Sequence, residues 1–248
     1  MTLLRRIALS LVAASALSCG EAAPLGDGGD ASTGIAATRE LARCRERVAS
    51  AADLVTIEAV VRHINALPAP VTVPCFVASL PRPFTVVATS SVTSAQPASG
   101  ARSPRLFLLF PAMTLSVVAE GHGAHLVELG QWSALHRSIK GEFELPWTQP
   151  LATDAPFTRV RYQQGGTSCG FCHREEDPTP SATGAYSSGA LRPVTDSLVS
   201  LAQLRAIPAM ACENNGDTSD KCLFWHALFD YGDVQQGAFD PAIETLFR

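Results

Sequence analysis

The spacing of hydrophobic positions changes twice along this chain. Between about residues 38 and 67, apolar side chains recur at the i, i+3, i+4 and i+7 positions of one helix face, as in Ile57, Val60, Val61 and Ile64. Asp53 or Thr56 is expected to cap the second part of this stretch, and Pro68 is expected to end it. The sequence therefore predicts a helical lead-in.

Between about residues 71 and 162 the apolar runs become short, and Pro, Gly and Ser separate them. Within residues 138–145, Ile139, Phe143 and Leu145 fall on one side and Lys140, Glu142 and Glu144 on the other, which is the period of a half-buried strand. The runs interpreted as strands are CFVASL, FTVVATSS, RLFLLF, TLSVVAE, HLVELG, SIKGEFEL and FTRVRY. Because no crossover helices are predicted between them, we expect an antiparallel β-sandwich or barrel-like core.

After residue 165 the chain is rich in loop-forming residues, with helical patterns near 197–205, 219–231 and 241–247. Asp240 before Pro241 is a favourable helix start, and Gly232 a favourable stop. The predicted fold class is thus α+β. It comprises a helix plus β-sandwich domain over residues 37–165 and a loop-rich helical C-terminal region over residues 166–248.

The N-terminus has the features of an export signal. In residues 1–18, Arg5 and Arg6 precede an apolar run that is too short to span a bilayer, which is typical of a secretory signal peptide. The segment ALSCG at 16–20 resembles a bacterial lipobox, although that family more often has Leu where this chain has Ala16. The resemblance implies that Cys19 is acylated and anchors the protein in the outer membrane or periplasm. Cleavage after residues 14–16, Ala-Ser-Ala, would instead release a soluble secreted protein.

Composition indicates which partners and which redox environment to expect. Residues 19–36 are rich in Gly, Ala, Asp and Ser and are expected to form a flexible tether. With Lys+Arg 19 against Asp+Glu 23 and no basic tract, nucleic acid is not an expected partner. An exported chain meets an oxidising compartment, so four of its cysteines are expected to form disulfides, Cys44 with Cys75 and Cys212 with Cys222. The first would clamp the helical lead-in to the sheet, and the second would close a turn-rich loop.

One short motif contains side chains that can bind a cofactor. Cys169-Gly-Phe-Cys172-His173 has the Cys-x-x-Cys-His spacing, which resembles the haem attachment site of the cytochrome c family. That resemblance implies that Cys169 and Cys172 form thioethers to one haem c and that His173 binds its iron. It covers only five of 248 residues, so it implies a cofactor and not a fold. The role expected is electron transfer or redox sensing with a redox partner protein, more as an electron carrier or binding protein than as a catalyst.

The second iron ligand is less clearly marked. Met210, within Ile207-Pro-Ala-Met210, loosely resembles a distal methionine segment and ranks first, and His226 on a predicted helix ranks second. His122 and His125 lie in the loop GHGAH. Each residue also has an ordinary structural explanation, Met210 as core filler and the histidines as surface, loop or satisfied core residues.

Two other uses of the same residues remain open. Cys-Gly-Phe-Cys-His also looks like the active site of periplasmic thioredoxin-like disulfide isomerases, but that mechanism needs a long following helix, which Pro178 and Pro180 would interrupt. Alternatively, Cys169 and Cys172 form a plain disulfide, or a metal site with His173, in a non-catalytic binding or structural lipoprotein. The acidic run at 175–177 is expected to be solvated.

Overall fold

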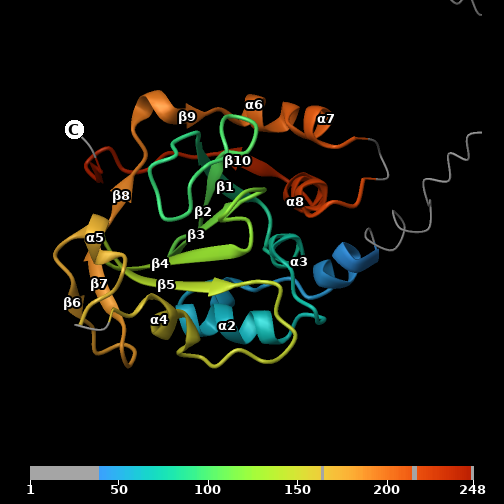
Figure 1. The fold of residues 1–248 in the computed structure, drawn as a ribbon. Coiled ribbons are helices and arrows are strands. Elements are labelled where there is room, and N and C mark those ends of the chain that lie inside the picture. The colour runs from blue at the N-terminus through green and yellow to red at the C-terminus, as the bar shows by residue number, and fades with distance from the viewer. Residues whose placement is uncertain (1–38, 163–164, 214–216, 247–248) are drawn as a thin grey trace, which may run out of the picture.

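The computed structural model describes residues 39–162, 165–213 and 217–246 (Figure 1). The expected signal peptide, Cys19 and the expected tether lie outside the described residues. Among the helices that are described, none combines the length and the apolar character needed to cross a bilayer.

Nine strands of the described chain pair into one sheet in the order β10-β1-β2-β3-β4-β5-β7-β6, with β9 also paired to β1. Neighbouring strands are antiparallel except β1 and β10, which are parallel. Their bounds are β1 (Phe84–Thr89), β2 (Arg105–Leu109), β3 (Met113–Val118), β4 (Leu126–Ala134), β5 (Arg137–Glu144), β6 (Asp177–Pro178), β7 (Tyr186–Gly189), β9 (Leu198–Val199) and β10 (Val234–Gln236). A separate parallel pair joins β8 (Leu191–Arg192) to β11 (Glu244–Thr245). The α+β class is confirmed, and its antiparallel core is one continuous sheet and not two facing sheets.

Short helices surround this sheet. They are a helix over 39–45, η1 (Ala51–Leu54), α2 (Ile57–Asn65), α3 (Val73–Ala78), α4 (Ala155–Val160), α5 (Gly170–His173), η2 (Thr195–Ser197), α6 (Leu201–Ala206), α7 (Pro208–Ala211) and α8 (Asp220–Phe229). Of the two expected caps of α2, Thr56 is the one used, because its side chain accepts a hydrogen bond from the Ala59 backbone amide. Asp53 instead accepts from Ser50 at the start of η1.

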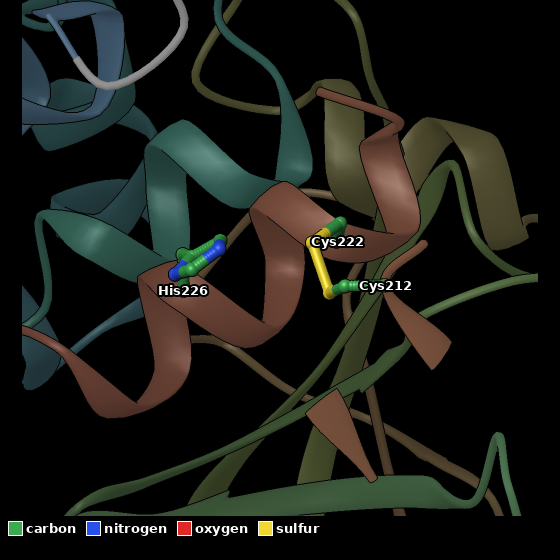
Figure 2. A group of neighbouring side chains, drawn as sticks. All are labelled: Cys212, Cys222 and His226. Atoms are coloured by element: carbon green, nitrogen blue, oxygen red, sulfur yellow. A yellow bond between two sulfur atoms is a disulfide. The ribbon is translucent and has the colours of Figure 1, made fainter. Parts of the chain in front are cut away.

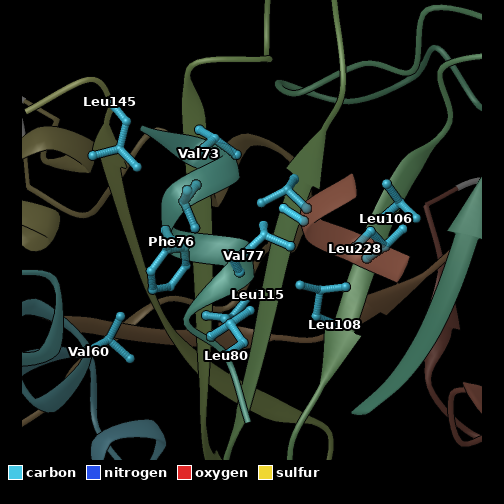
Figure 3. Close-up of a cluster of buried hydrophobic side chains, with 14 of the residues drawn as sticks. Val60, Val73, Phe76, Val77, Leu80, Leu106, Leu108, Leu115, Leu145 and Leu228 are labelled. Carbon is cyan, nitrogen blue, oxygen red and sulfur yellow. The ribbon is translucent and has the colours of Figure 1, made fainter. Parts of the chain in front are cut away.

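The main hydrophobic core lies between the sheet and helices α2, α3 and α8 (Figure 3). Helix α3 is wholly buried, and its Phe76 meets Phe143 of β5 edge to face with ring centroids 5.8 Å apart. The predicted disulfide between Cys44 and Cys75 is confirmed, and both residues are fully buried. The packing of these helices holds β5 in place, and the opposite face of β5 carries the candidate site described below.

Three predicted elements are wrong, and two of them were predicted as strands. The run CFVASL is not a strand but most of α3, because Thr72 caps a helix start and Pro74 occupies its first turn. The disulfide of Cys75 therefore joins two helices and does not clamp a helix to the first strand. FTRVRY is likewise mostly helix α4, which begins at Ala155 and has Pro156 in its first turn. Helix α3 is buried on all sides, so its sequence carries no periodicity that separates strand from helix, and α4 is too short to show one.

The expected C-terminal helix is also absent from the described part of residues 241–247, where a turn leads into β11. Asp240 does bind the Ala242 backbone amide at 2.9 Å, but its carboxylate also lies 3.0 Å from His136 Nε2. The regions 37–165 and 166–248 share one sheet, since β7 pairs with β5 and β10 pairs with β1.

Candidate functional site

The Cys-x-x-Cys-His motif forms the single helical turn α5, which packs near β7. Cys169 precedes this turn and is partly buried, whereas Cys172 is exposed, and neither cysteine forms a disulfide. Phe171 is 71% exposed and meets the Tyr162 ring edge to face at 5.3 Å. Two free thiols and one imidazole are therefore presented by one short turn.

Glu176 folds back and holds the loop before α5. Its carboxylate accepts hydrogen bonds from the Thr167 backbone amide, at 2.7 Å, and from the Thr167 hydroxyl. A Cβ on Gly170 would lie 2.5 Å from Glu176 Oε2, so only glycine leaves room for this contact. The acidic run was expected to be solvated, but Glu176 is half-buried and structural.

The chain reverses sharply after the motif. Arg174 and Glu175 have φ angles of 44° and 50°, in the left-handed region that non-glycine residues rarely adopt. Arg137 of β5 holds the reversed segment, because its Nη2 donates to the Glu175 carbonyl and to Asp177 Oδ2, both at 2.8 Å. These contacts tie the motif to the sheet, and nothing in the sequence spacing pointed to Arg137.

The imidazole of His173 is fixed by the neighbouring strand. Its Nδ1 lies 2.8 Å from the Gly189 carbonyl oxygen, which can only accept, so Nδ1 carries the proton and Nε2 keeps a free lone pair. Burial, with a smaller contribution from the Lys140 charge, lowers the pKa of His173 to about 3. His173 is therefore a neutral imidazole at physiological pH, in the form that binds metals.

His173 also lines a polar pocket on the sheet face opposite the main core. Strands β2 to β5 contribute alternating residues to it, because side chains that share one face recur every second position. Its volume is about 70 Å³, which is room for a few water molecules. The lining residues are Arg105, Phe107, Thr114, Ser116, Glu128, Leu129, Gly130, Trp132, Ser138, Lys140, His173, Ala190, Leu191 and Phe239.

Lys140 is the most unusual residue in this pocket. The alternation of β5 put it on the polar side, yet it is only 8% exposed, because residues 173, 190–191 and 239 close over that face. Its Nζ donates to Ser138 Oγ at 2.5 Å. Burial lowers the pKa of Lys140 to about 8, and the weaker effects of Cys169 and Glu128 oppose that shift.

The environment of Cys169 is unfavourable for a nucleophilic thiol. Burial raises the pKa of Cys169 to about 11, and a hydrogen bond with Thr167 only partly offsets this. The helix that follows is four residues long, so the extended helix of an isomerase active site is missing here. Cys169 is therefore a protonated thiol at neutral pH.

The expected distal ligands do not reach His173. Met210 lies on α7, 61% exposed, and α7 packs against α6 and α8 on the opposite side of the molecule from α5 (Figure 1). His226 lies on α8, with Nδ1 2.7 Å from Asp230 Oδ2. Met210 is thus neither core filler nor a partner of His173 in this structure. His125 lies 3.4 Å from Glu144, away from the pocket lining.

A second group of potential metal ligands includes His226. Figure 2 shows Cys212, Cys222 and His226 together, and their potential ligand atoms lie within 4.8 Å of one another. However, Cys212 and Cys222 form the predicted disulfide, with the sulfur atoms 2.07 Å apart. Because metals bind thiolates, this oxidised pair is a covalent link and not a metal site.

The donor set of α5 fits a c-type haem in its chemistry. The thiols of Cys169 and Cys172 are both free for thioether bonds, and His173 offers Nε2 while Nδ1 is held by a backbone carbonyl, as in many metal sites. The pocket by itself is too small to enclose a porphyrin. No protein-family model, curated protein or solved structure matches the chain.

Proposed function

We propose that this chain is an exported bacterial lipoprotein that carries one covalent c-type haem and transfers electrons or senses redox state at the cell envelope. One observation supports this most strongly. The two cysteines of the motif are the described cysteines that form no disulfide, and they share a turn with a neutral imidazole whose Nδ1 is already bound. A bound haem would supply one-electron chemistry between Fe(II) and Fe(III).

Each residue then has a separate task. Cys169 and Cys172 would hold the macrocycle covalently, and His173 would offer Nε2 to the iron. Gly189 fixes the tautomer and orientation of His173 through its carbonyl group. Glu176 and Arg137 keep the loop in place on both sides of α5, so the motif does not depend on its own short helix for rigidity.

The same geometry gives less support to the two alternatives. A thiol-disulfide oxidoreductase needs an attacking cysteine with a lowered pKa, whereas the pKa of Cys169 is raised by burial. A structural disulfide staple needs a bond between Cys169 and Cys172, and both thiols are free. No specific observation favours a second function over haem binding.

The decisive experiment is haem attachment. The full-length gene is expressed in a bacterial host with an active cytochrome c maturation system, and the exported protein is run on a denaturing gel. We expect haem staining at the mass of the chain, a Soret band, and about one haem per chain. Cys169→Ala/Cys172→Ala should abolish covalent haem, and His173→Ala should displace the Soret maximum of any haem that remains attached.

Matched variants separate these effects from misfolding. Cys212→Ala/Cys222→Ala also removes two cysteines and should keep its haem, and His122→Ala changes an exposed histidine and should keep the wild-type Soret maximum. A well-folded wild-type chain that acquires no haem in this host would overturn the proposal. Equal haem content in the Cys169→Ala/Cys172→Ala variant would do so as well.

The membrane anchor is tested independently. Metabolic labelling with a radioactive fatty acid should mark the wild-type protein, and Cys19→Ala should lose the label and be released from membranes. Labelling that survives Cys19→Ala would contradict lipidation at that residue. The result does not depend on haem, because the two proposals involve different cysteines.

A further inference from the structure

The pocket beside α5 contains a buried cation without an acidic partner. Lys140 is 8% exposed, and among the described residues no carboxylate oxygen lies within 4.0 Å of its Nζ. Its one hydrogen-bond partner in the described chain is Ser138 Oγ, although an ammonium group can donate three bonds. Buried charges in proteins are normally paired, so this ammonium group lacks a counter-charge.

The rest of the pocket does not supply that charge. Glu128 is the acidic residue in the lining, and its carboxylate is already paired with Arg105. Arg105 also donates to Ser116 Oγ at 2.6 Å. His173 is neutral. Within the lining the Arg105–Glu128 pair cancels, so Lys140 is the positive charge left without a carboxylate in contact. Glu176 lies outside the lining, is hydrogen-bonded to Thr167 and attracts Lys140 only weakly.

A second group in the same pocket is unsatisfied. The hydroxyl of Thr114, on β3, is buried and has no hydrogen-bond partner among the residues that the structure describes. A hydroxyl can donate one bond and accept others, so Thr114 offers a neutral donor in a pocket that already holds a cation. Aromatic rings of Phe107, Trp132 and Phe239 line the same space.

We propose that this pocket binds a carboxylate group, with Lys140 as its counter-charge and Thr114 as a hydrogen-bond donor. A carboxylate carries the single negative charge that the lining lacks and has two acceptor oxygens for two such donors. The volume of about 70 Å³ suits a group of a few heavy atoms. The inference does not rest on haem binding.

Two sources could supply this group. One is a small free carboxylate, and the other is a propionate side chain of a haem held at α5. The chemistry at Lys140 is the same for both, so the experiment includes a haem-free and a haem-loaded chain. The haem-free chain is the full-length Cys169→Ala/Cys172→Ala variant, which has no thiols for thioether bonds.

Binding is measured with acetate on the haem-free chain, at constant ionic strength against chloride. Lysine labelled with ¹³C gives an unusually simple spectrum, because Lys140 and Lys221 are the only lysines of the sequence. We expect a saturable shift of the Lys140 Cε signal with acetate, and no shift of the Lys221 signal. Absence of saturable binding, or an equal effect of chloride, would overturn the proposal.

Variants test the assignment to Lys140. Lys140→Met keeps an unbranched side chain, one heavy atom shorter, but removes the charge, and it should weaken acetate binding by about tenfold or more. Lys221→Met removes an ion pair with Glu120 on another surface and should leave acetate affinity unchanged. Acetate binding retained in folded Lys140→Met would refute the role of that residue. If Lys140→Met does not fold, the lysine spectrum of the unsubstituted pocket still decides the question.

The haem-loaded chain distinguishes the sources. If a propionate fills the pocket, the Lys140 Cε signal of the loaded chain should already resemble the acetate-saturated state and should not respond to acetate. If the natural ligand is a free carboxylate, the loaded chain should bind acetate as the haem-free chain does. Should no haem attach in any host, acetate binding would still stand, so the two proposals fail separately.

Discussion

At the scale of single residues, environment decides the chemistry more than residue type does. Lys140 and Lys221 are both lysines, but Lys221 is partly exposed and pairs with Glu120, whereas Lys140 is buried without a carboxylate. Similarly, the described cysteines divide into two disulfides and two free thiols. The free pair lies where a buried cation and a neutral imidazole also meet.

The lowered pKa of Lys140 makes a prediction about stability and pH. Below pH 8 the amine is protonated in both states, and the folded protein bears the full cost of burying the charge. Between about pH 8 and 10.5 the folded state loses the proton first, so the unfolded state binds more protons and stability rises with pH. Lys140→Met lacks this pH-dependent contribution to the free energy of unfolding.

We therefore expect the stability advantage of Lys140→Met over wild type to shrink by about 2 kcal/mol between pH 7 and pH 10. Urea unfolding of both proteins in chloride buffer measures it, since other titrating groups cancel in the difference. Lys221→Met should show no comparable change. A difference between Lys140→Met and wild type that stays constant with pH would mean that Lys140 is not perturbed.

At the scale of elements, local rules explain the helix starts, but covalent links hold the short helices in place. Helix α3 is six residues long, and the helix over 39–45 is similarly short, so neither is stable without tertiary contacts. The Cys44–Cys75 disulfide joins them across 31 residues of sequence, whereas Cys212–Cys222 spans 10. Loop-closure entropy makes the longer link the more stabilising one.

Removing the two disulfides should therefore have unequal effects. In the chain-entropy account, Cys44→Ala/Cys75→Ala should lower the free energy of unfolding by about 4 kcal/mol, and Cys212→Ala/Cys222→Ala by about 3 kcal/mol. Chemical denaturation of the two double variants checks the order. A larger loss for the Cys212–Cys222 pair would show that native-state packing, and not loop closure, dominates.

At the scale of the whole molecule, the two halves of the chain depend on each other. Strand β1 pairs with β2 from the first half and with β10 near the C-terminus, and β5 pairs with β4 and β7. The candidate pocket has the same composite origin, because β2 to β5 form its floor and the segment around His173 closes it. Folding of the C-terminal region is therefore a condition for forming the site.

Val234→Asp tests this dependence. Val234 is 3% exposed on β10 opposite Phe84, so a carboxylate there would be buried without a partner and should cost about 3 kcal/mol or more. The neighbouring Gln235 is exposed, and Gln235→Asp should have little effect. Circular dichroism and tryptophan fluorescence should report one shared unfolding transition in each variant. Two separate transitions in Val234→Asp would indicate that the halves fold independently.

The sequence by itself predicted the α+β class, the strands β1 to β5 and the two disulfide pairings, from local periodicity and the positions of the cysteines in an exported chain. It offered both Asp53 and Thr56 as caps of α2, and the structure decided for Thr56. It also marked Cys169, Cys172 and His173, whose spacing is a local property. It could not tell helix α3 from a strand, because a fully buried short run lacks a polar face, and the six residues of α4 are too few to show a helical period.

Only the tertiary structure decided which groups meet at the motif. Gly189, Glu176 and Arg137 reach α5 through strand pairing and a chain reversal, and Lys140 is buried because a distant segment covers the polar face of β5. Met210 is distant from His173 for the same reason, since the path of the chain and not residue type sets such distances. Burial and the counter-charge of an ion depend on contacts between remote segments, and sequence spacing carries no record of them.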